Sequence, residues 1–210
     1  MKRGGIQATW IDVGAHGGEA TLQFAIQNPG IKVYAFEPDL CVAAKSVGQA
    51  PNYFVIPVAV AEQDGTADFY VNAEGVASSL LPLNESAARS WIGGEQLRVD
   101  SIRTVPTVRL DTFMNLLGID KVDFLKIDAQ GADLAVVRSA GERLKDILRV
   151  KLEVDVTPSR LYDGSPSREE VIAFMEAKGF VLHETQSQSH GQEQDLTFAR
   201  PSGCNYRNDS

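Results

Sequence analysis

The 210-residue sequence predicts an α/β fold, with a mostly parallel, twisted sheet and helices on both of its faces. Short apolar runs alternate with helical patterns near both ends of the chain, and this order gives parallel strands joined by right-handed crossovers. A glycine-rich loop follows the first apolar run, which is typical of a ligand site at the carboxyl edge of such a sheet. The length suits one domain, which we place at residues 1–200.

The first third of the chain repeats a strand–helix unit. Apolar runs predict strands at residues 9–13, 31–36 and 53–60. The segments between them predict helices at 19–27 and 40–47, because each ends at a glycine or proline that stops a helix.

The middle of the chain departs from this pattern. Residues 66–71 (TADFYV) alternate with a period of two, as an antiparallel or edge strand does, and residues 97–110 also look extended. Residues 75–94 are small and polar and are expected to be irregular. We therefore interpret residues 62–110 as an inserted hairpin region, placed where it could act as a lid over a ligand site.

The alternating pattern then resumes. Asp111 is expected to cap a helix that runs to residue 117. Strands are expected at 122–128 and 147–156, helices at 132–139 and 167–178, and a terminal antiparallel pair at 180–183 and 195–200. The polar connection within that pair is expected to be mobile, and residues 201–210 to form a disordered tail.

Charge and hydropathy exclude some classes of partner. The formal net charge is −8, without a run of Lys and Arg, which argues against a nucleic-acid partner. No stretch of about 18 apolar residues is present, so no membrane partner is expected. The first residues lack the apolar core of a signal peptide, and we expect a cytoplasmic protein. The first strand begins almost at once, so a full-length relative could carry a segment before it. The oligomeric state cannot be read from the sequence.

The loop after the first strand carries Asp12, Gly14, His16 and Gly17, with Glu19 just beyond it. Its glycines do not have the GxGxxG spacing of a dinucleotide site, and its carboxylates would repel a pyrophosphate. They suit a cationic ligand with an ammonium and a sulfonium group, which describes S-adenosylmethionine (SAM). The alternative is that Asp12 only caps the loop. His16 either contacts the methionine carboxylate or only fills the turn.

Glu37 ends the second predicted strand, 23 positions after Gly14. An acid about 20 residues after the glycine loop accepts the ribose hydroxyls in adenosine-binding folds. Glu37 therefore supports an adenosine cofactor without choosing between NAD and SAM. The alternative is an exposed glutamate before a turn.

Three carboxylates are candidates for the chemistry. Asp128 ends a central strand at the carboxyl edge, and we predict that it is the general base or positions an acceptor. The rival interpretation is a structural aspartate that binds the next helix. Glu153 and Asp155, which share a strand face, are weaker candidates. The three together could hold Mg²⁺, but no compact metal motif supports this, and we predict no metal site.

Six blocks, in the family's order from about residue 9 to 198, resemble the FkbM family of methyltransferases: 11–21 (IDVGAHGGEAT), 34–38 (YAFEP), 58–65 (VAVAEQDG), 78–80 (SSL), 108–111 (VRLD) and 123–133 (DFLKIDAQGAD). The resemblance implies a Rossmann-like class I methyltransferase fold that binds SAM and releases S-adenosylhomocysteine (SAH). It adds Pro38 and Ala59, the latter near the adenine, to the cofactor-binding residues Asp12, Gly14, His16, Gly17, Glu37 and Asp128. His16 departs from the usual Asn, and Gln130 and Asp133 replace two Glu.

The implied reaction is O-methylation of a hydroxyl on a sugar, a secondary metabolite or a similar small acceptor or glycan. Two alternative functions can be compared with the sequence. An NAD(P)-dependent oxidoreductase would need GxGxxG and a Tyr-x-x-x-Lys or similar pair, and neither is present. A non-catalytic SAM- or nucleotide-binding module would carry the same binding residues without turnover.

Overall fold

The computed structural model describes residues 7–73, 75 and 77–201. Its helices and strands are β1 (Ala8–Val13), α1 (Leu22–Gln27), β2 (Ile31–Phe36), α2 (Leu40–Ala43), β3 (Tyr53–Ile56), β4 (Ala59–Val60), β5 (Gly65–Asn72), α3 (Glu85–Ser90), β6 (Val99–Val108), α4 (Leu110–Leu116), β7 (Phe124–Ile127), α5 (Asp133–Ser139), β8 (Arg149–Asp155), α6 (Arg168–Ala177), β9 (Val181–Gln188) and β10 (Glu193–Ala199), with short 3₁₀ turns at Gly94–Gln96, Gly141–Asp146 and Ser189–Gly191.

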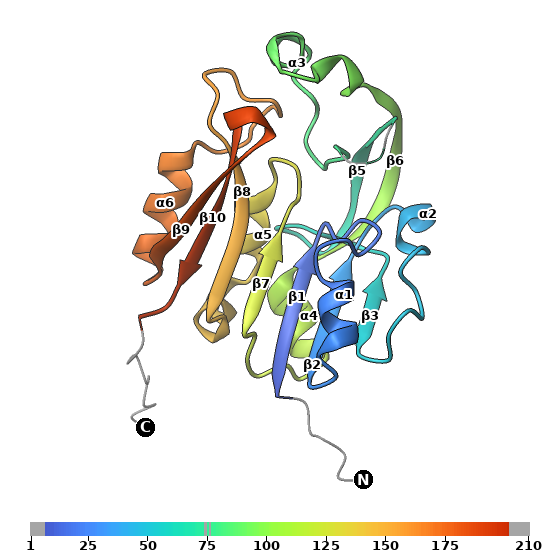
Figure 1. Cartoon of the computed structure of the whole chain (residues 1–210), viewed down its shortest axis with the longest axis vertical. Coiled ribbons are helices and arrows are strands. Elements are labelled where there is room, and N and C mark those ends of the chain that lie inside the picture. Colours follow the sequence, from blue (N-terminus) through green and yellow to red (C-terminus); the bar gives the residue numbers. More distant parts are fainter. Residues whose placement is uncertain (1–6, 74, 76, 202–210) are drawn as a thin grey trace.

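Seven strands form the central sheet in the order β3-β2-β1-β7-β8-β10-β9 (Figure 1). The pairs from β3 through β8 are parallel, and β10 is antiparallel to both β8 and β9. The strand order reverses at β1, between β2 on one side and β7 on the other. In parallel sheets a ligand site lies at such a switch point, outside the carboxyl ends of the strands.

The main hydrophobic core lies between one face of the sheet and the helices α4, α5 and α6. Inward-facing strand residues such as Leu125, Ile127 and Leu152 pack there with Met114 of α4 and Met175 of α6, all 2% exposed or less. Burying a side chain of this size stabilises a fold by about 1.5–3 kcal/mol. On the opposite face a smaller cluster forms under α1. This packing holds the carboxyl ends of β1, β2 and β7 in fixed positions.

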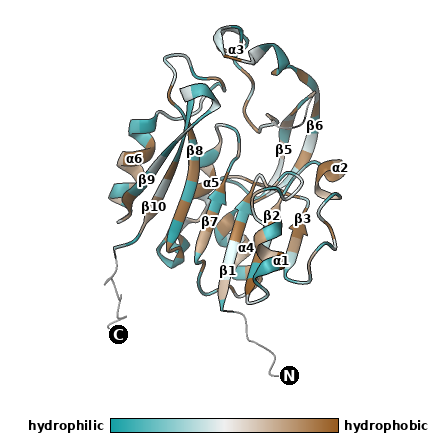
Figure 2. Cartoon of the chain, in the orientation of Figure 1, coloured by the Kyte–Doolittle hydropathy of each residue, from teal (hydrophilic) through white to brown (hydrophobic). Residues whose placement is uncertain are grey.

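One half of the opposite face carries charged side chains. Along β8, buried valines and leucine alternate with the half-buried Lys151, Glu153 and Asp155. Figure 1 shows α1 in front of β2, whereas none of the labelled helices lies in front of β8. The edge strand β9, which is separated from β8 by β10, is mostly hydrophilic (Figure 2). The three charges on a sheet strand are therefore explained by a face that no labelled helix covers.

The expected strand at 53–60 is two strands in two different sheets. Pro57 lacks an N–H and cannot donate to a ladder, so β3 ends at Ile56. β4 then pairs with β6 in a separate three-stranded sheet, β4-β6-β5. Within residues 62–110, β5 and β6 form the expected antiparallel pair, and the segment between them contains the unexpected helix α3.

Three other expectations are corrected. Helix α4 begins at Leu110 with Arg109 at its N-cap position, and Asp111 lies in the first turn, where its carboxylate binds the Arg109 guanidinium. The helices at 19–27 and 40–47 are shorter than expected. The polar connection expected to be mobile is mostly strand, because β9 and β10 extend to Gln188 and from Glu193. The predicted tail lies, apart from residue 201, outside the described residues.

Candidate active site

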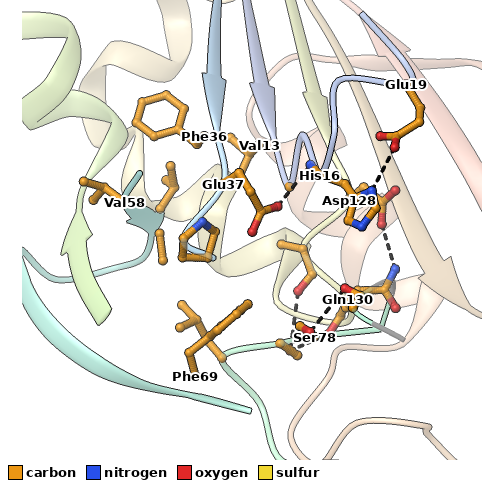
Figure 3. Close-up of a pocket in the computed structure, with 18 residues that line it drawn as sticks. Val13, His16, Glu19, Phe36, Glu37, Val58, Phe69, Ser78, Asp128 and Gln130 are labelled. Carbon is orange, nitrogen blue, oxygen red and sulfur yellow. Dashed lines mark hydrogen bonds and ion pairs between the residues drawn. The ribbon is translucent and has the colours of Figure 1, made fainter. Parts of the chain in front are cut away.

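A cavity of about 330 Å³ opens at the carboxyl ends of β1, β2 and β7, and we call it the main cavity (Figure 3). It is lined by Val13, Gly14, His16, Glu19, Phe36, Glu37, Pro38, Val58, Ala59, Val60, Phe69, Gly75, Ser78, Ser79, Leu80, Asp128, Ala129 and Gln130. Figure 3 shows apolar side chains such as Phe36, Val58 and Phe69 at one end and polar groups such as His16 and Asp128 at the other, with Glu37 between them. Such a cavity fits an elongated ligand with an apolar and a polar end.

The glycine loop brings bare backbone up to this cavity. Gly14 has a φ of +69°, and a Cβ placed on it would lie 1.9 Å from the backbone oxygen of Asp128. Only glycine fits this conformation and this approach without strain. The loop is held to β2, because the N–H groups of Gly14 and Ala15 both donate to the Phe36 carbonyl. The loop therefore forms a fixed cradle in which a ligand can contact main-chain atoms.

Glu37, between the two ends of the cavity, is fixed by backbone donors. Its Oε2 accepts from the His16 N–H at 3.0 Å, and its Oε1 accepts from the Asp39 N–H at 2.9 Å. Burial raises the pKa of the Glu37 carboxyl, and these two donors oppose that rise. A carboxylate oxygen can accept more than one hydrogen bond, so Glu37 can still receive a pair of ligand hydroxyls.

Asp12 lies behind the loop and not in the cavity. Its side chain is fully buried, 3.1 Å from Lys126 Nζ, and Thr21 Oγ1 donates to it at 2.5 Å. Lys126 also donates to the Gly14 carbonyl at 3.0 Å. Burial opposes the charge on Lys126, but Asp12 and Asp128 hold its pKa above the usual range. This ion pair therefore supports the glycine loop from below.

Asp128 lies between the loop and the middle region of the chain. Gln130 Nε2 donates to Asp128 Oδ1 at 2.7 Å, and Lys126 Nζ lies 3.6 Å from Asp128 Oδ2. Tyr162 donates to Gln130 Oε1 at 2.8 Å and fixes that amide. The Asp128 side chain is 40% exposed, so its carboxylate is both oriented and accessible. Among the described residues no hydrogen bond or ion pair joins the Asp128 side chain to α5, and the Ala129 N–H donates to Asp133 of that helix.

The hairpin region closes one wall of the main cavity. Ser79 Oγ donates to the Gln130 carbonyl at 2.7 Å and accepts from the Leu81 N–H at 2.9 Å. Ser78 Oγ accepts from the Asn72 N–H at 2.9 Å. These two serines tie the segment after β5 both to its own strand and to the loop after β7.

A second cavity of about 330 Å³, here called the side cavity, lies on the α1 side of the sheet. It is lined by Gly14, Ala15, His16, Glu19, Ala20, Lys126, Ile127, Asp128, Lys151, Glu153, Gln188 and Asp195. Burial raises the pKa of Glu153, and the carboxylates of Glu193 and Asp128 raise it further. Asp128 lines both cavities.

Residues 12–182 match the Methyltransferase FkbM domain. The chain belongs to the FkbM methyltransferase family. A curated relative, the 2-O-methyltransferase NoeI of Sinorhizobium fredii (strain NBRC 101917 / NGR234), is 27% identical over 165 residues, which are 73% of this chain and 65% of the relative. The chain therefore spans less than two thirds of the length of the relative.

Solved structures show the fold of this FkbM-family chain. M. capricolum TrmK, in complex with SAH, aligns with a TM-score of 0.52 at 7% identity over 92% of this chain and 62% of the other. Aeropyrum pernix fibrillarin with natively bound SAM aligns with a TM-score of 0.51 at 14% identity over 93% and 67%. The predicted family and the predicted fold class, a Rossmann-like class I methyltransferase fold, are confirmed.

The structure brings most of the predicted site residues of this FkbM-family chain together. Gly14, His16, Glu37, Pro38, Ala59 and Asp128 line the main cavity, and Glu153 and Asp128 line the side cavity. Gly17 and Asp12 line neither. Asp155 also lines neither, because its carboxylate accepts from the N–H groups of Thr157 and Leu161 and holds the loop after β8.

Sequence reasoning missed the contribution of the hairpin region to the apolar end. Phe69 and Leu80 line the main cavity there, and the period-two pattern of β5 was the signal that one of its faces is buried. Within the described part of the chain, no group of three or more His, Cys, Asp or Glu side chains is placed to hold a metal ion. No helix among the described residues is long and apolar enough to cross a membrane.

Proposed function

We propose that this protein transfers the methyl group of SAM to a hydroxyl oxygen of a small-molecule or glycan acceptor and releases SAH. The observation that carries the proposal is the position of Glu37, held between the apolar end of the main cavity and the glycine loop. The apolar end suits the adenine ring, Glu37 suits the two ribose hydroxyls, and the cradle of Gly14 and His16 suits the methionine part. Membership of the FkbM family supports this use of the cavity.

We propose distinct roles for the remaining site residues. Pro38 and Ala59 border the adenosine, and Asp128, which lines both cavities, positions the acceptor hydroxyl. Asp12 and Gly17 act through the loop, with Asp12 holding Lys126 beneath Gly14. Residues 62–110 form a lid region within a single domain. We propose no metal ligand. The net charge of −8 supports a small acceptor over a nucleic acid.

The test is a titration of the purified protein with SAM, SAH and NADH by calorimetry. We expect micromolar binding of SAM and SAH and no response to NADH. In Glu37→Gln the affinity for SAH should fall roughly 10- to 100-fold, because a hydrogen bond to a charged group contributes about 1.5–3 kcal/mol. The matched control is Glu142→Gln, an exposed glutamate outside both cavities, which should bind as the wild type does.

Binding of NADH, or an unchanged SAH affinity in Glu37→Gln, would contradict the proposal. Methyl transfer to a panel of hydroxyl compounds separates an enzyme from a non-catalytic binding module. A module would bind SAM and release no SAH with any acceptor.

A further inference from the structure

The side cavity differs chemically from the main cavity. Eight of its lining side chains are polar or ionisable: His16, Glu19, Lys126, Asp128, Lys151, Glu153, Gln188 and Asp195. None of the described residues that line it is Phe, Tyr or Trp. The main cavity, in contrast, has Phe36, Phe69 and several aliphatic side chains. A flat aromatic ligand therefore suits the main cavity, and a ligand with many hydroxyl groups suits the side cavity.

The charges of the side cavity are balanced in pairs across neighbouring strands. Lys151 Nζ lies 2.9 Å from Asp195 Oδ2, which also accepts from Gln188 Nε2 at 2.8 Å. Lys126, next to Lys151 in the β7–β8 register, is paired with Asp12. Because each of the two lysines is paired with a carboxylate, the wall of the cavity offers closely spaced hydrogen-bond donors and acceptors. Hydroxyl groups both donate and accept, so they match such a wall.

Glu153 stands apart in this arrangement. It lies opposite Asp195 in the β8–β10 pairing, and within the described chain its carboxylate has no hydrogen-bond or ion-pair partner. Its backbone N–H donates to Asp133 at 3.1 Å, which fixes its place on the strand. A half-buried carboxylate without a partner, in the wall of a polar cavity, is available to a ligand.

The two cavities meet at the point where transfer would take place. They share Gly14, His16, Glu19 and Asp128 as lining residues. A ligand in the side cavity would therefore lie beside the polar end of a ligand in the main cavity, with Asp128 between them. Two adjoining sites of this kind are what a reaction between two bound substrates requires.

We propose that the side cavity binds the methyl acceptor, that the acceptor is a polyhydroxylated compound of the carbohydrate class, and that Glu153 takes the proton of the reacting hydroxyl. This inference rests on the proposed function and deepens it. With SAM bound, the acceptor oxygen forms a bond to the methyl carbon as the carbon–sulfur bond breaks, its electron pair stays on sulfur, and the hydroxyl proton passes to the Glu153 carboxylate. The products are SAH and a methyl ether.

The surroundings of Glu153 make its carboxylate a strong base once it is ionised. The titratable groups around it are Lys151 on its own strand, Lys126 of β7 and Asp128 after it, Asp133 of α5, Glu193 and Asp195 of β10, and Tyr162 in the loop after β8. Four of these seven are carboxyl groups, and like charges together with burial favour a bound proton. The rate of transfer should therefore rise with pH as Glu153 loses its proton.

The experiment compares the wild type with Glu153→Gln, Lys151→Met and a control, Lys145→Met. Lys145 is an exposed lysine that precedes β8 and lines neither cavity. Circular dichroism and urea unfolding check that each variant is folded. Calorimetry measures the affinity for SAH and for 5′-methylthioadenosine, which lacks the amino-acid end. Saturation-transfer NMR on the SAH complex, and methyl transfer from SAM, then test methyl glycosides of glucose, mannose, galactose and rhamnose, with catechol as an aromatic hydroxyl compound.

We expect at least one glycoside to bind the SAH complex and to be methylated, and catechol to do neither. Glu153→Gln should retain glycoside binding, lower kcat by about 100-fold or more, and lose the rise of kcat with pH. Lys151→Met should raise KM about tenfold. Both variants should bind SAH and methylthioadenosine within about threefold of the wild type, and Lys145→Met should match the wild type in every assay.

Three results would overturn the inference. If the wild type binds SAH but no glycoside, the acceptor class is wrong. If Lys151→Met loses affinity for SAH but not for methylthioadenosine, the side cavity holds the amino-acid end of the cofactor. If Glu153→Gln keeps the wild-type kcat and pH profile, Glu153 does not take the proton. Failure of the wild type to bind SAH is a separate result, which would reject the proposed function itself.

Discussion

Gly14 lets the loop after β1 approach the end of β7 at the wall of the main cavity. Its φ is positive, and a Cβ added to it would overlap the Asp128 carbonyl oxygen at 1.9 Å, because the loop after β1 crosses directly over the end of β7. The sequence could predict a glycine loop here from the spacing to the next helix. It could not predict the neighbour, since the Asp128 carbonyl is 114 residues away in the chain and only the sheet order places it there.

We predict that Gly14→Ala destabilises the protein by roughly 2–5 kcal/mol and abolishes SAH binding, because strain at positive φ costs about 1–2 kcal/mol and a forced backbone shift adds roughly 1–3 kcal/mol. The matched control is Gly118→Ala. Gly118 also has a positive φ, +59°, but a Cβ there would meet nothing within 4 Å. The control should therefore lose only about 1–2 kcal/mol, the cost of positive φ alone, and bind SAH normally. Equal losses in urea unfolding of the two variants would show that the contact with Asp128 is unimportant.

At the scale of elements, the hairpin region is fastened to the rest of the chain at several places, including the following three. Ser79 bonds to the loop after β7, Leu83 forms an isolated bridge with Tyr162, and the Ile92 N–H donates to Gln192 Oε1 at 2.8 Å. The first of these lies in the wall of the main cavity. The hairpin region is therefore held in place at Ser79, and a lid movement would have to involve other parts of residues 62–110.

We predict that Ser79→Ala speeds hydrogen exchange of the amides at residues 79–81 and 83 and weakens SAH binding several-fold. The change removes one acceptor and one donor from a side chain that is 1% exposed, at a cost of about 1–3 kcal/mol. Ser90→Ala, at the exposed end of α3, is the control and should change neither measurement. Unaltered exchange in Ser79→Ala would mean that the remaining contacts of the hairpin region suffice to hold this segment.

The elements that sequence patterns predicted well are those with one buried face. The central strands and α6 keep their apolar periodicity, and α6 carries the Ser167–Glu170 capping box at its start. β9 was mostly missed because its side chains are exposed on both faces, so it has no apolar period. The break at Pro57 was missed because the apolar run continues through it, although the proline itself was the available signal.

On the scale of the whole molecule, carboxyl groups from distant parts of the chain meet at the carboxyl edge of the sheet. Their individual places were predictable, because strand ends could be read from the sequence. Their environments were not. Asp12 was expected at a ligand and lies against Lys126, and Asp155 was expected in the crevice and holds a loop. Burial and pairing depend on contacts between strands that no local pattern encodes.

Asp133 shows how this concentration of carboxyl groups affects stability. It is 1% exposed and joins three elements, because its oxygens accept from the N–H groups of Ala129 after β7 and Glu153 on β8. Burial, with the charge of Asp128, raises the pKa of Asp133 to about 7 from the usual 3.8. Between these two values the folded protein holds a proton that the unfolded chain has lost. The contribution of Asp133 to stability is therefore fully present below pH 4 and is lost as pH rises toward 7.

We predict that the free energy of unfolding of the wild type, minus that of Asp133→Asn, falls as pH rises from 4 to 7, by at most about 1.4 kcal/mol per pH unit. The asparagine variant cannot titrate at this position, so the subtraction removes the other carboxyl groups that titrate in the same range. Urea unfolding at half-unit steps of pH measures both proteins. Asp120→Asn, at an exposed aspartate, should differ from the wild type by a constant. A difference for Asp133→Asn that is flat or rises with pH would show that the buried carboxyl is ionised in the folded protein, held by its two backbone donors.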